Sequence, residues 1–367
     1  MIATDNPKGM PSLFDPLSLG SVQLPNRIVM APLTRLRAAA PVHVPNQFMA
    51  QYYVQRASAG LIITEGVPVS PQAIGYPNVP GIWTKEQVAG WRRISDAVHT
   101  AGGRMFMQLW HVGRISDPQY LGGDLPVAPS AIAAPDHVFL LSPKRPFVVP
   151  RALAVEEIPG IIESFRFAAQ NAKLAGFDGV TLHGGNGYLL DQFLQDGTNH
   201  RTDGYGGSVQ RRARLMLEVT DAVADVWGAD RVGMHLAPRA PNHGVSDSHP
   251  ETTFGYVASE LGKRGLAFLF IRETRGPGAL LEKLKREFGG AIIANDGFDF
   301  TAGAEAVKQG LADAVAFGKD YIANPDLVHR FKIGAPLNPV VAETIYDLPA
   351  SGARGYTDYP SLGVSSL

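Results

Sequence analysis

Residues 291–317, AIIANDGFDFTAGAEAVKQGLADAVAF, contain one complete strand–helix–strand unit. The two ends of this stretch, AIIA at 291–294 and AVAF at 314–317, are short uninterrupted apolar runs. Such runs are typical of parallel strands that are covered on both faces. Between them, residues 302–309 have the 3.6-residue periodicity of an amphipathic helix. The stretch therefore predicts two neighbouring parallel strands joined by a crossover helix.

The same unit recurs along the chain. Short apolar runs are found at residues 27–31, 60–65, 104–109, 179–183, 232–236, 267–271, 291–294 and 314–317. Helical periodicity is found at residues 85–101, 155–175, 208–227, 251–264, 279–288, 302–309 and 325–333, with Thr84 and Ser208 as candidate helix caps. A strand-then-helix unit repeated about eight times favours a closed barrel over an open doubly wound sheet. We therefore predict an α/β fold, a single (β/α)8 TIM barrel.

Two segments lie outside this repeat. Residues 13–24 predict a short hairpin that plugs the bottom of the barrel. Residues 114–151 form a long insertion after the third strand, rich in Pro, Gly and Asp, and its part 137–149 has strand-like stretches. Long insertions in compact domains are usually lids or binding loops. The predicted organisation is a flexible tail at 1–12 and one domain at 13–362, with 114–151 as a lid-like insertion.

The composition indicates a small-molecule partner. The 367 residues carry a net charge of −1, and 45% of them are hydrophobic. A near-neutral protein lacks the electrostatic footprint of a binder of nucleic acid or anionic membrane. Because the chain has no cysteine, disulfides, thiolate metal sites and a cysteine nucleophile are excluded. No signal peptide or membrane-spanning apolar stretch is visible, so a cytoplasmic location is expected.

Polar residues follow the predicted strands at their carboxyl ends, where barrel active sites lie. Strand seven is followed by Asn295, Asp296 and Gly297, and strand eight by Gly318 and Lys319. Barrels often bind phosphate at these two loops, through backbone N–H groups that glycine leaves open to close approach. Lys319 adds a cation suited to phosphate, whereas the Asp296 carboxylate should point away. The two loops therefore predict a phosphorylated ligand.

The fourth strand ends in His183, which is followed by Asn186 and Tyr188. His and Asn side chains can donate hydrogen bonds to one oxygen and stabilise charge that develops on it. Tyr188 can deliver a proton nearby. The set suits addition of hydride and proton across a double bond conjugated to that oxygen. For any single histidine at a strand end a structural role is the alternative, and no metal site is expected because His183 and His235 lack a third ligand.

Seven motifs extend this interpretation over almost the whole chain. They are NRIVMAPLTR (26–35), SAGLIITEG (58–66), QLWHVGR (108–114), HGGNGYLLDQFL (183–194), NHRTDGYGGS (199–208), DAVAFGKDYIANPDL (313–327) and GYTDYP (355–360). With these motifs in this order, the chain resembles the Old Yellow Enzyme family of FMN-dependent ene-reductases. The closest likeness is to its bacterial branch of nitrate-ester, N-ethylmaleimide and xenobiotic reductases.

The resemblance implies FMN as cofactor, NADPH or NADH as reductant, and a role for each matching residue. The implied FMN contacts are Pro32, Leu33, Thr34, Ala59, Gln108, His235, Asn295, Gly297, Gly318 and Lys319, of which the last three residues would hold the phosphate. His183 and Asn186 would hold the substrate oxygen, and Tyr188 would be the proton donor. Tyr76, Trp110 and Tyr356 would line the substrate pocket.

Two places depart from the family pattern. The family usually has Arg at the position of His235, where its cation faces the N1–O2 side of the flavin. A positive charge there stabilises anionic reduced flavin. Either a protonated His235 or Arg239 supplies it here, or the flavin potential is lower. The second departure is the charged stretch RETR at 272–275, which is expected to alter the pocket rim or the phosphate end.

The resemblance implies a ping-pong reaction that reduces an electron-poor alkene or nitro compound, with nitrate esters as a further substrate class. Three alternatives stay open: a double-bond isomerase that uses the same flavin, a flavin-binding protein with little turnover, and a flavin-free sugar-phosphate isomerase or aldolase. The last needs a catalytic side chain inside the barrel, and Glu65 is the clear strand-end candidate. A monomer or homodimer is expected.

Overall fold

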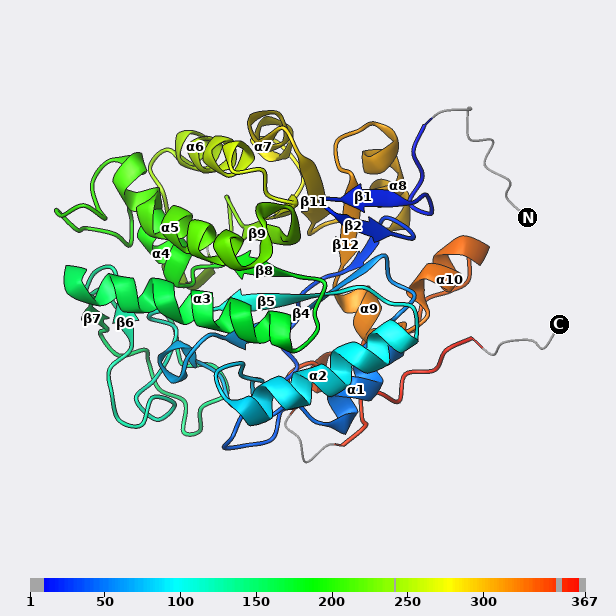
Figure 1. Ribbon diagram of the computed structural model, residues 1–367, viewed down its shortest axis with the longest axis horizontal. Coiled ribbons are helices and arrows are strands. Elements are labelled where there is room, and N and C mark those ends of the chain that lie inside the picture. Colours follow the sequence, from blue (N-terminus) through cyan, green and yellow to red (C-terminus); the bar gives the residue numbers. More distant parts are fainter. Residues whose placement is uncertain (1–9, 241, 348–351, 363–367) are drawn as a thin grey trace.

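The computed structural model describes residues 10–240, 242–347 and 352–362 (Figure 1). Its central strands form a closed parallel barrel in which β3, β4, β5, β8, β9, β10, β11 and β12 follow one another around the ring. Their bounds are Ile28–Met30, Leu61–Pro68, Met105–Trp110, Gly179–His183, Val232–Leu236, Phe268–Arg272, Ala291–Asn295 and Ala314–Phe317. Each apolar run predicted as a strand is a strand of this barrel, so the predicted TIM barrel is confirmed.

Alternate residues of the strands pack on opposite faces of the sheet, as the period of two requires. Val29, Leu61 and Phe106 belong to a cluster inside the barrel. Their neighbours Ile28 and Ile62 belong to the larger cluster between the strands and the helices. Both faces of each strand are therefore buried, which explains why the strands read as uninterrupted apolar runs.

The helices that surround the barrel largely match the predicted ones. The observed helices that coincide with predicted ranges are α2 (Lys85–Thr100), α3 (Ile158–Leu174), α5 (Val209–Trp227), α6 (Pro250–Lys263), α7 (Leu281–Phe288), α8 (Phe300–Lys308) and α10 (Leu327–Ile333). Thr84 and Gln87 form a reciprocal capping box at the start of α2. Ser208 precedes α5 as predicted, but its side chain makes no capping hydrogen bond.

Several short elements were not predicted. They are the helices α1 (Gln47–Val54), α4 (Leu189–Leu194) and α9 (Lys319–Ala323), and the 3-10 turns η1 (Pro71–Ala73), η3 (Ala229–Arg231), η4 (Asn242–Gly244) and η5 (Ala342–Thr344). A further 3-10 turn, η2 (Val155–Glu157), forms the start of the predicted helix 155–175. Each of the unpredicted helices and turns spans eight residues or fewer.

The hairpin that precedes the barrel closes its N-terminal end. Strands β1 (Leu17–Leu19) and β2 (Val22–Leu24) pair antiparallel. Leu19, Val22 and Leu24 belong to the same cluster as the residues inside the barrel. The Ser21 N–H donates to the carbonyl of Asp230, just before β9, over 3.2 Å. The predicted plug is therefore confirmed, whereas most of the predicted flexible tail, residues 1–9, lies outside the described residues.

The insertion at 114–151 lies across the carboxyl end of the barrel. Its two short strands, β6 (Val127–Ala128) and β7 (Arg151–Ala152), pair parallel. The prediction of strands within 137–149 was wrong, since this part has a single isolated bridge between His137 and Pro146. The Arg114 guanidinium donates to the carbonyls of Ile132 (3.0 Å) and His243 (2.9 Å), which ties the insertion to the loop after β9.

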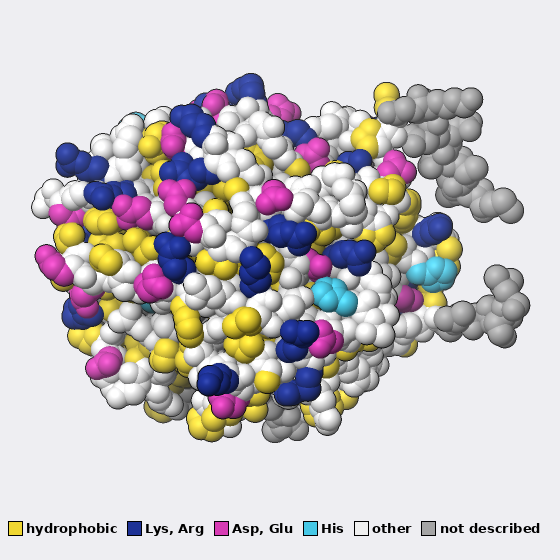
Figure 2. All heavy atoms as spheres, in the orientation of Figure 1, with side chains coloured by type: hydrophobic (Ala, Val, Ile, Leu, Met, Phe, Trp, Pro, Cys, Tyr) yellow, Lys and Arg dark blue, Asp and Glu magenta, His cyan; other side chains and the backbone are white. Residues whose placement is uncertain are grey.

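Basic and acidic side chains are interspersed on the face shown in Figure 2. This mixture agrees with the net charge of −1. Among the described residues, no helix is both long enough and apolar enough to cross a membrane.

Candidate active site

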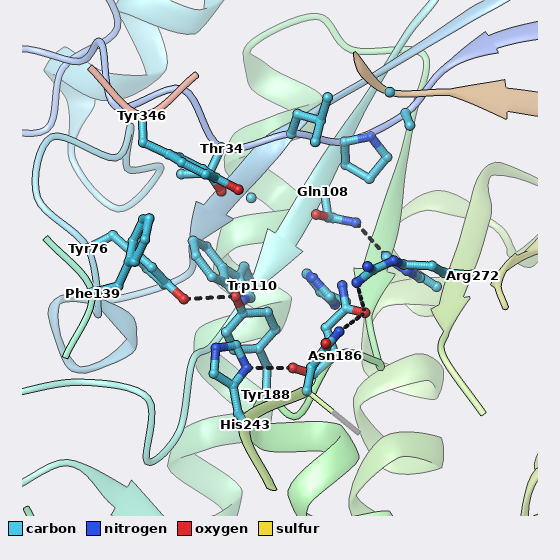
Figure 3. Close-up of a pocket in the computed structure, with 18 of the residues that line it drawn as sticks. Thr34, Tyr76, Gln108, Trp110, Phe139, Asn186, Tyr188, His243, Arg272 and Tyr346 are labelled. Carbon is cyan, nitrogen blue, oxygen red and sulfur yellow. Dashed lines mark hydrogen bonds between the residues drawn. The ribbon is translucent and has the colours of Figure 1, made fainter. Parts of the chain in front are cut away.

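A cavity of about 600 Å³ opens at the carboxyl ends of the barrel strands (Figure 3). Every barrel strand, or the loop that follows it, contributes to its wall. Thirteen of the sixteen predicted site residues line it: Pro32, Leu33, Thr34, Tyr76, Gln108, Trp110, His183, Asn186, Tyr188, His235, Asn295, Gly318 and Lys319. The ends of the barrel strands and their loops thus meet at one point, as expected for a barrel.

Tyr356 does not line this cavity, and its predicted place in the substrate pocket was wrong. Its side chain is fully buried, and its ring stacks on Tyr52 with 4.3 Å between centroids. The guanidinium groups of Arg35 and Arg37 lie 5.0 and 5.1 Å from the Tyr356 ring. Tyr356 therefore belongs to a buried cluster of arginines and tyrosines, and Tyr346 lines the cavity instead.

Ala59 and Gly297 also lie outside the lining of the cavity. Ala59 precedes the amino end of β4 and packs in the outer cluster, at the opposite end of the strand from the cavity. Gly66, near the carboxyl end of β4, lines the cavity instead. A Cβ atom at Gly66 would lie 2.6 Å from the Trp110 ring, so any side chain there would force the indole to shift. Gly297 has φ +73° and lies beside the Arg275 backbone.

Asn186 is held from three sides. Its Oδ1 accepts from the Arg272 guanidinium at 2.9 Å and from the Asn242 amide at 3.4 Å. Its backbone oxygen lies 2.8 Å from Nδ1 of His243. The residue has φ +57°, a left-handed conformation that Asn tolerates better than most side chains. With Oδ1 occupied by two donors, the NH2 group of Asn186 is the part left to bind another acceptor.

His183 completes a pair of donors with Asn186. Its Nδ1 is buried and has no hydrogen-bond partner among the described residues. Burial, the neighbouring His235 and Arg272 hold the pKa of His183 well below its usual range, so the ring is neutral. A neutral imidazole carries one N–H and can still donate to an oxygen in the cavity. A buried polar atom without a partner is the kind of group that a ligand satisfies.

Tyr188 lies against the same pair of residues. Its hydroxyl is 3.1 Å from that of Tyr76, and its ring meets His183 edge-on at 4.8 Å and Trp110 at 4.9 Å. Burial and the neighbouring Tyr76 raise the pKa of Tyr188 well above its ordinary value. Tyr188 therefore keeps its proton at neutral pH and can donate it.

Neither His235 nor Arg239 provides the positive charge that the sequence led us to expect beside the flavin. Burial, followed by the charge of Arg272, lowers the pKa of His235 to about 3, so this histidine is neutral. It stacks on His183 at 4.6 Å, and its Nδ1 lies 3.1 Å from the amide nitrogen of Gln108. Arg239 pairs with Glu273, outside the cavity lining. The side chain that brings a positive charge to this side of the cavity is Arg272, at the end of β10.

The ends of β11 and β12 contribute Asn295, Gly318 and Lys319 to the cavity wall, and Asn295 is the cross-strand neighbour of Arg272. Asn295 donates to the carbonyl of Ala316 at 2.9 Å, which joins the ends of β11 and β12. The Asp296 carboxylate is 3.5 Å from Nε of Arg272. The acidic group thus pairs with a cation from the neighbouring strand.

Comparison with known proteins decides the family. The sequence profile of the NADH:flavin oxidoreductase / NADH oxidase family matches residues 12–338. The chain belongs to this family. It is 42% identical to 12-oxophytodienoate reductase 2 of Arabidopsis thaliana over 365 residues, which are 95% of this chain and 96% of that protein. It is 39% identical to flavin oxidoreductase hxnT of Emericella nidulans over 383 residues, 95% and 97% of the two chains.

Solved structures place this flavin oxidoreductase among the Old Yellow Enzymes. Morphinone reductase in complex with tetrahydroNAD superimposes with a TM-score of 0.92 at 48% identity, over 97% of this chain and 99% of that one. An Old Yellow Enzyme homologue from Zymomonas mobilis gives a TM-score of 0.92 at 44% identity, over 96% and 100% of the two chains. The resemblance inferred from the motifs is therefore confirmed, and with it FMN and a nicotinamide reductant.

The cavity of this flavin oxidoreductase fits FMN. Its volume suits a ligand of that size. His183 Nδ1 and His235 Nε2 are buried and have no hydrogen-bond partner in the described part of the chain, which leaves hydrogen-bonding capacity for the oxygen and nitrogen atoms of a bound ring system or substrate. Lys319 is the cation at the end predicted for phosphate.

Several lining residues were not among the sixteen predicted site residues, although Arg272 belongs to the stretch 272–275 that was expected to alter the pocket rim. They are Ala31, Gly66, Pro135, Asp136, His137, Phe139, Phe147, Asn242, His243, Phe270, Arg272 and Tyr346. Gly66 and Arg272 stand at strand ends, a signal that could have identified them. The insertion and Tyr346 carry no such signal, because their path over the barrel depends on long-range packing.

Proposed function

We propose that this flavin oxidoreductase is an ene-reductase that reduces the C=C bond of small electron-poor alkenes in a ping-pong cycle. When bound, FMN would supply the chemistry of hydride transfer between NADH or NADPH and the alkene. The observation that carries the proposal is the placement of two neutral donors, His183 and Asn186, beside the protonated hydroxyl of Tyr188.

The family's cofactor would be held along the wall of the cavity. In this proposal Pro32, Leu33 and Thr34 contact the ring system, and Gln108 and His235 serve its pyrimidine end. Their positions at the ends of β3, β5 and β9 support these roles. The phosphate would be held by the remaining lining residues of the last two strands, Asn295, Gly318 and Lys319.

His183 and Asn186 would bind the oxygen conjugated to the double bond. Negative charge grows on that oxygen when hydride reaches the β-carbon, and donors fixed in a buried site stabilise such charge strongly. Tyr188 would then protonate the α-carbon. The 3.1 Å hydrogen bond to Tyr76 supports this role, because it fixes where the Tyr188 hydroxyl points.

The aromatic walls favour flat substrates. Tyr76 and Trp110 stack at 5.4 Å, and Phe139 of the insertion meets Tyr346 edge-on at 4.9 Å. Figure 3 shows Tyr76, Phe139 and Tyr346 on one side of the cavity, facing Asn186 and Arg272 on the other. Enones, maleimides and nitroalkenes combine a flat apolar body with a polar oxygen, and nitrate esters present the same type of oxygen. The names of the relatives, 12-oxophytodienoate reductase and morphinone reductase, support the reductase assignment.

The structure weakens the alternative of a flavin-free isomerase or aldolase, because its candidate catalytic residue does not reach the cavity. Glu65 does not line the cavity: its carboxylate accepts from the Arg35 backbone N–H at 3.2 Å and from the Tyr53 hydroxyl at 3.3 Å. A flavin-dependent double-bond isomerase could use the same residues. It differs from an ene-reductase in that its alkene substrate does not reoxidise the reduced protein. A cytoplasmic location and a monomeric or homodimeric state stay predictions.

The deciding experiment is a visible absorbance spectrum of the holoenzyme, recorded anaerobically before and after NADH or NADPH, and again after 2-cyclohexenone. Bleaching by the nicotinamide followed by full recovery with the enone supports the cycle. Bleaching without recovery by enones, maleimides or nitroalkenes contradicts the ene-reductase proposal. Rearrangement of the alkene without net reduction would favour the isomerase.

A further inference from the structure

Arg272, the first residue of the charged stretch 272–275, occupies a central place in the cavity wall. It is the last residue of β10, and 35% of its side chain is exposed. Its Nη1 donates to Oδ1 of Asn186 at 2.9 Å, and its Nε lies 3.5 Å from the Asp296 carboxylate. Figure 3 shows the guanidinium directed at Asn186. Arg272 therefore connects the substrate-binding pair to the loop that follows β11.

The contact has a consequence for the Asn186 amide. An amide group can bind with either its oxygen or its nitrogen toward a partner. If Asn186 were flipped, its NH2 would face the donors of Arg272 and Asn242 and both hydrogen bonds would be lost. A hydrogen bond from a charged donor is worth more than a neutral one. Arg272 therefore selects the orientation in which the NH2 of Asn186 is available to the substrate.

The charge of Arg272 also lies close to His183 and Asn186, the pair proposed to bind the substrate oxygen. Among the described residues that line the cavity, the permanent cations are Arg272 and Lys319, since burial keeps His183 and His235 neutral. Lys319 follows β12, which lies across the ring from β8, the strand that carries His183. Asp296 is 42% exposed and lies on the Nε side of the guanidinium, so it offsets this charge only in part. Arg272 is thus the cation nearest to the substrate-binding pair.

We propose that Arg272 is a positioning residue for the substrate oxygen: it fixes the Asn186 amide with its NH2 toward the cavity and makes the pair prefer an oxygen that bears negative charge. This inference rests on the proposed binding of the substrate oxygen by His183 and Asn186. It predicts that the protein favours ligands whose oxygen is anionic, or becomes so during the reaction.

The test is a double-mutant cycle between Arg272→Met and Asn186→Ala, read by ligand binding to the oxidised holoenzyme. The probe is 4-chlorophenol, whose phenolate carries charge on an oxygen attached to an sp² carbon, as the enolate of a reduced enone does. Its dissociation constant is obtained from the change in FMN absorbance. Loss of a charged hydrogen bond predicts that Arg272→Met weakens binding about tenfold in the wild-type background. In the Asn186→Ala background the same change should weaken binding much less.

One further variant separates the effect of the hydrogen bond from that of the charge, and a second serves as a control. Arg272→Gln keeps an amide donor without the charge and should recover part of the lost affinity. Arg275→Met removes a nearby arginine that lies outside the cavity lining and stacks on Phe298, so binding should be unchanged. FMN content of each variant reports folding. Equal effects of Arg272→Met with and without Asn186 would overturn the proposal. So would a variant that binds the phenol normally and differs only in its FMN midpoint potential.

The outcome is independent of the ene-reductase assignment. If wild-type protein binds the phenol but its reduced form is not reoxidised by any enone, the proposed function fails. The double-mutant cycle still measures the coupling between Arg272 and Asn186 in that case. If enones are reduced and the coupling is absent, the positioning role fails and the proposed function stands.

Discussion

Replacement of Tyr188 by Phe tests the assignment of the proton donor. The substitution removes one oxygen from a buried residue and leaves the ring contacts with His183 and Trp110 in place. It also removes the hydrogen bond between Tyr188 and Tyr76. Because the hydroxyl faces another side chain within the cavity, no main-chain hydrogen bond is lost and the fold should be retained. The expected effect is confined to the step that needs a proton.

The size of the effect follows from the role. General acid catalysis by a positioned side chain contributes roughly 10²- to 10⁴-fold, or about 3–5 kcal/mol. Loss of the hydrogen bond alone is worth about 1 kcal/mol, which corresponds to about fivefold. Tyr76→Phe is therefore the matched control, because it breaks the same hydrogen bond and keeps the proton on Tyr188. The two variants should differ by at least one order of magnitude.

The assay is anaerobic stopped-flow absorbance of the two half-reactions. In Tyr188→Phe, bleaching by NADH or NADPH should keep the wild-type rate, whereas reoxidation by 2-cyclohexenone should slow by roughly 10²- to 10⁴-fold. Wild-type rates in both half-reactions would refute the assignment of Tyr188. Slowing of both by similar factors would refute the reasoning as well, because it would indicate a general distortion of the cavity.

Three further predictions concern residues that support the site or the barrel. Gly66→Ala places a Cβ 2.6 Å from the Trp110 ring, so we expect the indole to shift and the KM for 2-cyclohexenone to rise severalfold in steady-state assays. Burial raises the pKa of Glu65 to about 7, so the stability that the protonated side chain contributes is fully present below pH 4.5 and is lost as the pH rises through 7. Glu65→Gln should therefore make the free energy of unfolding, measured in urea, depend less on pH over this range. Thr84→Ala breaks the capping box with Gln87 and should cost about 1 kcal/mol, read as a lower Tm with unchanged enone reduction.

The barrel was predictable because its strands are buried on both faces. A run such as GVTLH at 179–183 is apolar enough to stand out, and it coincides with β8. Helices of four or more turns, such as α5, were equally visible. The short helices α1, α4 and α9 and the interior of the insertion were not, because their conformation depends on contacts with residues distant in the sequence. His137, for example, pairs with Pro146 in one bridge and has no other strand partner.

The site was predictable where a residue stands at the carboxyl end of a strand. His183 and Gln108 met this condition and line the cavity. Ala59 failed it, since it lies before the amino end of β4. Tyr356 belongs to no barrel strand, and its ring is enclosed by Tyr52 and two arginines. The position of such a residue follows from packing that the sequence does not reveal.

The placement of positive charge shows how a barrel can rearrange a site without changing its fold. In the register of the sheet, His235 of β9 lies opposite Phe270 of β10, and Arg272 stands two residues beyond Phe270. Residues two apart on a strand point to the same side, so Phe270 and Arg272 both face the cavity. A cation lost at His235 can therefore be supplied by the next strand at the same side of the cavity. Burial first, and then the nearby Arg272 guanidinium, lower the pKa of His235 to about 3, so the cation on this side of the cavity is the arginine and not the histidine.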